Sequence, residues 1–474
     1  MKRAVDNFDQ FAYDVEPSAK RRAPVDVAVD PASASAIIPA VPAGGVADAD
    51  QQRVLAAVAA GRNVFITGAG GCGKSWVIQE LRRQTEAGEG VMVLAASTNA
   101  AVAVINGDCT IHAFCGWTPS AKTPSATASR IGKQRNVATR IRQCTRLVID
   151  EISMISAGAL AWFSEVVARV RNRTGPFGGL QLIVSGDFYQ LPPVPDRGAT
   201  EAENRPCLYG PCWQACQFVT CTLTTPHRFA DAEYVALLQR VRVGTPSAED
   251  YAALQSRVGA NVTKDGITPT MLSATRAQVD SLNQTELEKC PAATEHVYPA
   301  TILVDAPKGA TSPKPSAVDL AKRVTARRST VLRVGAQVMC VKNLPELALY
   351  NGARGVVVAF VDAQPEVRWA AGHTCVVGLA TWTMADPQKQ WSATYTQIPL
   401  LLAWATTIHV TQGATLDCVE CDLGPSIFQG GQGYVALSRV KSLACLSLRH
   451  FVPQALRAPV LPTPPPSASS SSAS

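Results

Sequence analysis

The chain has 474 residues, 47% of them hydrophobic and 6% aromatic, and a formal net charge of +7. This size predicts two to four domains with aliphatic cores, and the modest basic excess is compatible with a nucleic-acid partner. No apolar stretch is long enough for a bilayer and no secretory apolar segment is present, so we expect no membrane association and an intracellular protein with free thiols.

Both ends of the chain have the composition of disordered tails, residues 1–45 and 456–474. In the first tail, the basic groups Lys2-Arg3 and Lys20-Arg21-Arg22 match a two-part nuclear import signal, and the alternative is a solvated charged tail. Acidic residues in the same tail argue against a mitochondrial transit peptide. We therefore place the nucleus ahead of the mitochondrion.

The segment "NVFITGAGGCGKSWVIQEL" (63–81) predicts a strand, a glycine-rich turn and a helix. It fits the phosphate-loop pattern, in which backbone N–H groups and the helix N-terminus hold phosphate oxygens. Lys74 should reach the β- and γ-phosphates, and Ser75 should ligate Mg²⁺. The alternative is an accidental glycine turn. The predicted nucleotide contacts in this loop are Gly68, Ala69, Gly70, Gly71, Cys72, Gly73, Lys74 and Ser75.

The segment "RLVIDEISM" (146–154) places two carboxylates after an apolar strand. Asp150 lies where a second Mg²⁺-directed carboxylate is expected, and Glu151 is then placed to orient or activate the attacking water. The alternative is a capping carboxylate pair at a strand–helix turn.

The segment "LIVSGDFYQLPPV" (182–194) also leaves a buried strand through polar residues. Apolar strands that alternate with helices predict a parallel sheet covered on both faces, and such sheets bind ligands at the carboxyl ends of their strands. Asp187 and Gln190 should therefore lie beside the two preceding motifs, where a carboxylate and an amide suit a phosphate or a metal. We expect Gln190 to sense the γ-phosphate and the two prolines to hold its loop as a relay.

Two arginines are candidates for the charge that closes on a nucleotide during hydrolysis. Arg228 precedes an amphipathic helix in "TPHRFADAEYVALLQRVRVG", and Arg439 ends "GQGYVALSR". An isolated arginine is usually a surface residue, so neither is informative alone.

From about residue 47 to 450, the chain resembles the Pif-type DNA helicases of superfamily one, which are related to RecD and Dda. The motifs occur in family order, and they include the phosphate loop, "DEISM", "SGDFYQLPPV", "HRF", "GAQVMCVKNLPELALYNGARGVVV" and "IHVTQGATLD". The resemblance implies an α/β fold of two RecA-like domains, at 46–222 and 223–455. It also implies a small β-barrel insertion near 335–395.

The resemblance also implies roles for single residues. Arg228 and Arg439 become charge clamps, and Gln51 lies in the motif that reads adenine. Gln412 and Gly413 lie in the motif that couples nucleotide to DNA. The implied DNA contacts are Thr98, Asn99, His112, Phe114 and His409.

Some features remain open at this stage. Val410 stands where the family usually has Lys, which removes a cationic contact. Residues 118–149 contain seven basic residues and no acid, which we interpret as a DNA-binding stretch, with a solvated basic face as the alternative. Trp117 is either a base-stacking or a core residue.

The sequence therefore predicts an ATP- and Mg²⁺-dependent enzyme, a 5′-to-3′ DNA helicase that acts as a monomer in repair, recombination, replication or telomere maintenance. The expected partners are single-stranded and forked DNA, with RNA–DNA hybrids as a further candidate. One alternative is a single-strand-stimulated translocase that strips proteins without processive unwinding, and another is a non-enzymatic DNA-binding scaffold.

Overall fold

The computed structural model describes residues 46–461 except 89, 118–122, 133–134, 197, 230, 263–267, 306–323, 325, 343, 350–351, 371, 387–390 and 417. The predicted import signal and most of both tails lie outside this part of the chain. Within it, no helix combines the length and the apolar character needed to cross a membrane. All fourteen cysteines are free, as the sequence predicts.

The first half of the chain is built on a six-stranded sheet in the order β3-β2-β4-β5-β1-β6, and every pairing is parallel. The strands are β1 (Val64–Thr67), β2 (Met92–Ala96), β3 (Cys109–Thr110), β4 (Arg146–Asp150), β5 (Gln181–Ser185) and β6 (Val219–Thr222). This sheet confirms the predicted parallel architecture.

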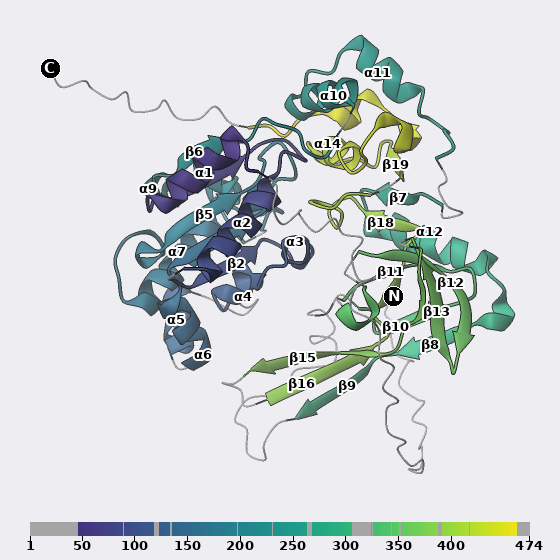
Figure 1. Ribbon diagram of the computed structural model, residues 1–474, viewed down its shortest axis with the longest axis horizontal. Coiled ribbons are helices and arrows are strands. Elements are labelled where there is room, and N and C mark those ends of the chain that lie inside the picture. Colours follow the sequence, from purple (N-terminus) through teal and green to yellow (C-terminus); the bar gives the residue numbers. More distant parts are fainter. Residues whose placement is uncertain are drawn as a thin grey trace, which may run out of the picture. The chain divides into compact units, whose positions relative to one another are not determined.

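Helices cover both faces of this sheet, because its strands are apolar on both sides (Figure 1). Along β1, Val64 and Ile66 point into one core and Phe65 into the other. The helices are α1 (Ala49–Ala59), α2 (Lys74–Glu86), α3 (Asn99–Val104), α4 (Ile111–Phe114), α5 (Pro124–Gly132), α6 (Arg135–Gln143), α7 (Ala157–Arg171), α8 (Glu201–Asn204) and α9 (Pro211–Ala215).

The second half contains another parallel sheet, in the order β18-β7-β19-β20. Its strands are β7 (Thr270–Ser273), β18 (Ala405–Thr407), β19 (Val419–Leu423) and β20 (Leu446–Phe451). The accompanying helices are α10 (Ala232–Val243), α11 (Ala248–Gln255), α12 (Arg276–Lys289) and α14 (Gln432–Leu437). A hydrophobic core joins α10 and α14 to β7, β19 and β20, and it also includes Leu191 from the first half of the chain.

Between β7 and β18 the chain forms antiparallel sheets, in the orders β14-β13-β12-β11-β17, β15-β16-β9 and β10-β8 (Figure 1). The strands are β8 (His296–Pro299), β9 (Thr301–Asp305), β10 (Ser329–Leu332), β11 (Gln337–Cys340), β12 (Arg354–Val361), β13 (Gln364–Trp369), β14 (Thr374–Val376), β15 (Ala380–Asp386), β16 (Trp391–Gln397) and β17 (Leu400–Leu402). These strands start before and end after residues 335–395, where the sequence places an insertion.

Candidate nucleotide and DNA site

Three polar loops meet at one edge of the first sheet. Strands β4, β5 and β1 are neighbours and all run in the same direction, so their carboxyl ends lie side by side. The loop after β1 carries Lys74, the loop after β4 carries Glu151, and the loop after β5 carries Gln190. The predicted grouping of these motifs is confirmed by this strand order.

The phosphate loop has the backbone conformation that its glycines permit. Gly71 and Gly73 have φ values of 85° and 84°, and a Cβ on Gly73 would lie 2.6 Å from Nε2 of Gln51. Lys74 Nζ donates hydrogen bonds to the carbonyl oxygens of Gly68 at 2.7 Å and Ala69 at 3.0 Å. The Lys74 side chain therefore lies along its own loop. Ser75 follows it as the second residue of α2.

Gln51 lies beside the phosphate loop, as its predicted role requires. It is buried and completes a capping box at the start of α1, in which its Oε1 accepts from the Asp48 N–H and Asp48 Oδ1 accepts from its N–H. Asp48 also pairs with His227 at 2.9 Å, and the His227 N–H donates to the carbonyl of Gly71. The segment before Arg228 is thereby held against the loop.

Asp150 and Glu151 are both buried at the end of β4. Burial raises the pKa of Asp150, and burial together with the neighbouring Asp150 charge raises the pKa of Glu151 to about 7. Glu151 also has a left-handed backbone, with φ of 53° and ψ of 45°. A left-handed backbone is uncommon for a residue other than glycine, and here it turns the chain sharply directly after β4.

Residues of the second half contact Glu151 and each other. Gln412 Nε2 donates to Glu151 Oε2 at 2.8 Å, which is a contact between residues 261 positions apart. Arg228 donates to the carbonyls of Gly413 at 3.2 Å and Ser438 at 3.4 Å. The structure thus brings the predicted coupling residues to the predicted water-activating carboxylate.

Arg439 is fully buried, and its guanidinium is held by its own half of the chain. It donates to the carbonyls of Thr411 and Ala414, each at 2.9 Å, and of Val435 at 2.7 Å. Burial and the nearby Arg228 lower the pKa of Arg439 to about 9. In this structure Arg439 therefore fixes the loop that carries Gln412.

The loop after β5 contains a contact that sequence reasoning missed. Asp187 is fully buried and accepts two hydrogen bonds from Arg242 of α10, at 2.9 and 2.8 Å. The interpretation of Asp187 as a group for a phosphate or metal is therefore corrected, because a guanidinium occupies both of its oxygens. Gln190 is buried, its Nε2 makes a long 3.5 Å bond to Asp187, and its Oε1 has no partner among the described residues.

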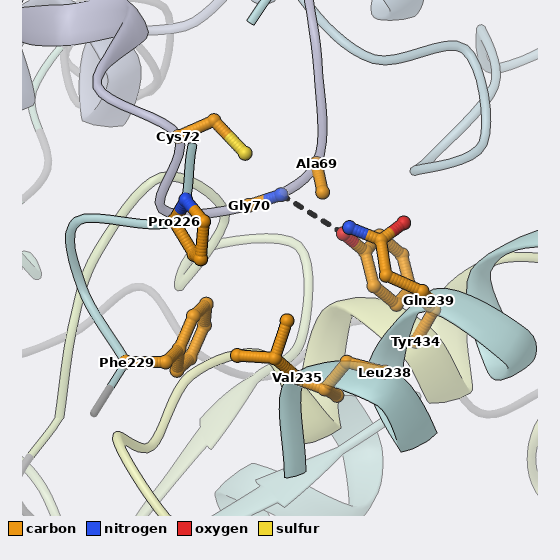
Figure 2. Close-up of a pocket in the computed structure, with 9 residues that line it drawn as sticks. All are labelled: Ala69, Gly70, Cys72, Pro226, Phe229, Val235, Leu238, Gln239 and Tyr434. Carbon is orange, nitrogen blue, oxygen red and sulfur yellow. Dashed lines mark hydrogen bonds between the residues drawn. The ribbon is translucent and has the colours of Figure 1, made fainter. Parts of the chain in front are cut away.

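Figure 2 shows a second missed residue, Tyr434 of α14, whose hydroxyl accepts a hydrogen bond from the Gly70 N–H at 2.9 Å. This contact closes one side of a small pocket between the phosphate loop and α10. The pocket is lined by Ala69, Gly70, Cys72, Pro226, Phe229, Val235, Leu238, Gln239 and Tyr434. Tyr434 lies inside the quoted motif "GQGYVALSR", which does not by itself assign it a contact, whereas Arg242 lies on a helix among apolar residues without a local sequence signal.

The predicted DNA contacts near β2 and α4 differ in their surroundings and in how far they are buried. Thr98 Oγ1 accepts from the Ala101 N–H and caps α3, whose first residue is Asn99, although the Asn99 side chain is outside the described part. His112 is partly buried and packs edge-on against Phe163 and Trp117, with ring centroids 5.0 and 5.2 Å apart. Burial lowers the pKa of His112, which favours its neutral form.

Phe114 lies fully buried in the core beneath α7. The expected DNA contact is therefore corrected, because no surface of its ring reaches the solvent. Arg140 covers this ring at 5.6 Å and donates to the carbonyl of Ala113. The other described arginines of the basic stretch whose side chains are defined also bond within the first half of the chain: Arg130 to Gly116, Arg142 to Val170, and Arg146 to Gln181 and Thr85.

His409 and Val410 lie in the turn after β18, which also carries Gln412. His409 is partly buried, and burial and the nearby Arg276 lower its pKa. Val410 is 46% exposed, as single apolar side chains on a protein surface often are. A Cβ on Gly413 would lie 3.4 Å from Glu151 and 3.6 Å from Val104 of α3, so this turn approaches both the carboxylate and α3.

Comparisons with known proteins agree on one family. Residues 47–250 match the PIF1-like helicase family, and residues 320–360 match the family "DNA helicase Pif1, 2B domain". The ATP-dependent DNA helicase PIF1 of Homo sapiens is 39% identical over 415 residues, covering 86% of this chain and 61% of the human protein. The chain thus spans about three fifths of the length of that relative.

Two further relatives match over most of their length. The ATP-dependent DNA helicase Pif1 of Bdellovibrio bacteriovorus is 32% identical, covering 86% of this chain and 88% of that protein. The crystal structure of the Pif1 helicase from Candida albicans superposes with a TM-score of 0.76 at 30% identity, covering 88% of this chain and 97% of that one. This likeness confirms the predicted fold with two RecA-like domains, and the chain belongs to the PIF1-like helicase family.

Proposed function

We propose that this protein is an ATP-dependent DNA helicase that moves 5′-to-3′ on single-stranded DNA. The observation that carries the proposal is the hydrogen bond between Gln412 and Glu151, because it joins the loop of the predicted DNA path directly to the predicted catalytic carboxylate. We further propose that residues 46–222 and 223–455 are the two domains that close on ATP, with the antiparallel sheets as the insertion of the second.

Asp150 and Ser75 are suited to hold Mg²⁺. The Asp150 carboxylate is buried with a raised pKa, and no described basic side chain lies within ion-pair distance of it, so a cation would stabilise its charged form. The bound ion would neutralise charge on the phosphates. Ser75, at the start of α2, would supply the second oxygen.

The remaining residues have separable roles in hydrolysis. Lys74 turns from its loop carbonyls to the β- and γ-phosphates, and Gln51 binds the adenine. Glu151, once ionised, accepts a proton from the attacking water, and Gln190 senses the γ-phosphate by turning its Nε2 donor from Asp187 to a phosphate oxygen. Arg228 and Arg439 stabilise the charge that develops, which requires both to leave carbonyl partners in the second half of the chain.

DNA binding is proposed for Thr98, Asn99, His112 and His409, and Trp117 is added as a stacking surface. Forked DNA and RNA–DNA hybrids are proposed substrates, and the protein is proposed to act as a monomer. Nuclear residence is proposed from the basic groups in residues 1–45. A fluorescent fusion of these residues that stays in the cytoplasm would contradict that proposal.

Steady-state ATP hydrolysis with and without single-stranded DNA tests the proposed activity, with Lys74→Ala as control. Stimulation by DNA that disappears in Lys74→Ala is expected, and it would rule out the non-enzymatic scaffold. Displacement of a strand from a duplex with a 5′ tail then tests unwinding and polarity.

Val410 favours a second candidate function, a translocase that hydrolyses ATP on DNA and removes bound proteins without processive unwinding. An exposed valine at this position offers no charge to a phosphate. This candidate predicts DNA-stimulated hydrolysis and displacement of streptavidin from a biotinylated strand, with no separated duplex.

A further inference from the structure

The relay loop, residues Gly186–Pro193, is anchored in both halves of the chain. Phe188 packs in the core of the first sheet, with its ring centroid 5.6 Å from that of Phe65 and 5.8 Å from that of Trp213. Three residues later, Leu191 is fully buried in the core of the second sheet. Gln190 lies between these two anchors, so a relative movement of the two cores must displace it.

Arg242 of α10 makes two side-chain contacts to this loop. Its guanidinium donates two hydrogen bonds to the fully buried Asp187 and lies over the ring of Tyr189, 4.5 Å from the centroid. Two parallel charge-assisted bonds plus ring stacking fix the orientation of the loop more closely than one bond does. Since only 16% of the Arg242 side chain is exposed, the pair is largely removed from water.

Helix α10, which carries Arg242, is also joined to the predicted DNA-coupling loop. The Tyr234 hydroxyl of α10 donates to the carbonyl of Leu437 in α14 at 2.7 Å. Two residues after Leu437, Arg439 bonds the carbonyls of Thr411 and Ala414, on either side of Gln412. A continuous set of packed and hydrogen-bonded groups therefore connects the loop that carries Gln412 to Arg242, and through Arg242 to the relay loop.

We propose that Arg242 is a positioning residue for ATP hydrolysis, which sets the place of Gln190 by holding Asp187 and Tyr189. Movement of the second half on DNA then changes the position of Gln190 against the γ-phosphate. This inference rests on the proposed function, since it assigns a regulator to the same site. It gives Asp187 a role as the anchor of the loop and not as a ligand.

Substitution of Arg242 tests the inference through kcat and KM for ATP, measured separately at saturating single-stranded DNA. In Arg242→Gln, kcat should fall by roughly ten- to a hundredfold, because small displacements of positioned groups have effects of this size. KM for ATP should stay within about threefold, since no group that binds the ground state is removed. Arg242→Lys keeps the positive charge but cannot donate two parallel hydrogen bonds, so its kcat should lie between those of the wild type and of Arg242→Gln.

Arg240→Gln is the matched control. Arg240 lies on the same helix and also donates two hydrogen bonds to a carboxylate, each at 2.7 Å, but this carboxylate is Asp250 of α11 in the same half of the chain. The kcat of Arg240→Gln should remain within about twofold of the wild-type value. An equal loss of kcat in both variants would overturn the inference, because it would trace the effect to helix stability.

The double variant Asp187→Asn/Arg242→Gln separates positioning from stability. It leaves no buried charge unpaired, so its melting temperature should recover relative to Arg242→Gln. A kcat that stays low supports the inference, and a kcat that recovers with stability overturns it. If wild-type hydrolysis is not stimulated by DNA, the proposed function fails. If the wild type is stimulated and Arg242→Gln has the same kcat at saturating DNA, only this inference fails.

Discussion

The polar side chains around the proposed catalytic carboxylate are almost completely removed from water, whereas two side chains beside the predicted DNA contacts are exposed. Glu151, Gln190 and Gln412 are each less than 9% exposed, while Trp117 is 41% and Val410 is 46% exposed. Bond cleavage benefits from fixed polar groups in a dry environment. A strand that must slide past the protein needs shallow contacts that form and break, so the two regions follow opposite requirements.

The largest expected effect concerns the buried carboxylate. Glu151→Gln should lower kcat for ATP hydrolysis by about 10²–10⁴-fold, because the general base is lost while the hydrogen bond from Gln412 is kept. ATP binding, measured with a fluorescent analogue, should persist. Glu165→Gln, on the exposed side of α7, is the control and should be silent. Substantial hydrolysis by Glu151→Gln would move the catalytic role to another group.

Phe114 marks the boundary between the two regions, because a predicted DNA contact proves to be a core residue. Phe114→Ala should reduce the free energy of unfolding by about 3–5 kcal/mol, and Phe114→Leu by less than about 1.5 kcal/mol. Denaturant titration measures both. DNA affinity of Phe114→Leu should match wild type. If Phe114→Leu is stable but no longer binds DNA, Phe114 would have to be interpreted as a DNA contact after all.

These residues also show how far the sequence was informative. Gly68–Ser75, Asp150-Glu151 and Gln190 could be placed, because each follows an apolar strand and parallel strands end at one edge. Phe114 was misplaced because a short motif does not reveal which side of a four-residue helix faces the core. The Arg242–Asp187 pair was not predictable, since it joins residues 55 positions apart without a periodic signal.

Trp117 gives the next largest effect, on the DNA side of the comparison. Trp117→Ala should weaken single-strand binding by about 1–3 kcal/mol, the usual contribution of a stacked base. Its melting temperature should change little because the ring is partly exposed. Phe428→Ala, which removes a 59% exposed ring before α14, is the matched control. Equal DNA affinities of wild type and Trp117→Ala, measured by fluorescence anisotropy, would return Trp117 to a packing role.

Val410→Lys should have the smallest effect, and a favourable one. A lysine at this exposed position can reach a phosphate without losing buried apolar contacts, so single-strand binding should tighten and depend more on salt. The slope of log K against log[salt] should steepen by roughly 0.7, the value for one added phosphate contact on single-stranded nucleic acid. Anisotropy titrations across a range of salt concentrations measure the slope.

Val361→Lys, at the end of β12, adds the same charge at the same 46% exposure and separates local contact from net charge. If both variants steepen the slope equally, the effect belongs to the overall field, and Val410 is not on the DNA path. If only Val410→Lys does so, strand displacement by this variant becomes decisive. Improved unwinding would show that the missing positive charge limits the coupling of ATP hydrolysis to unwinding, because the substitution leaves the residues around Glu151 unchanged.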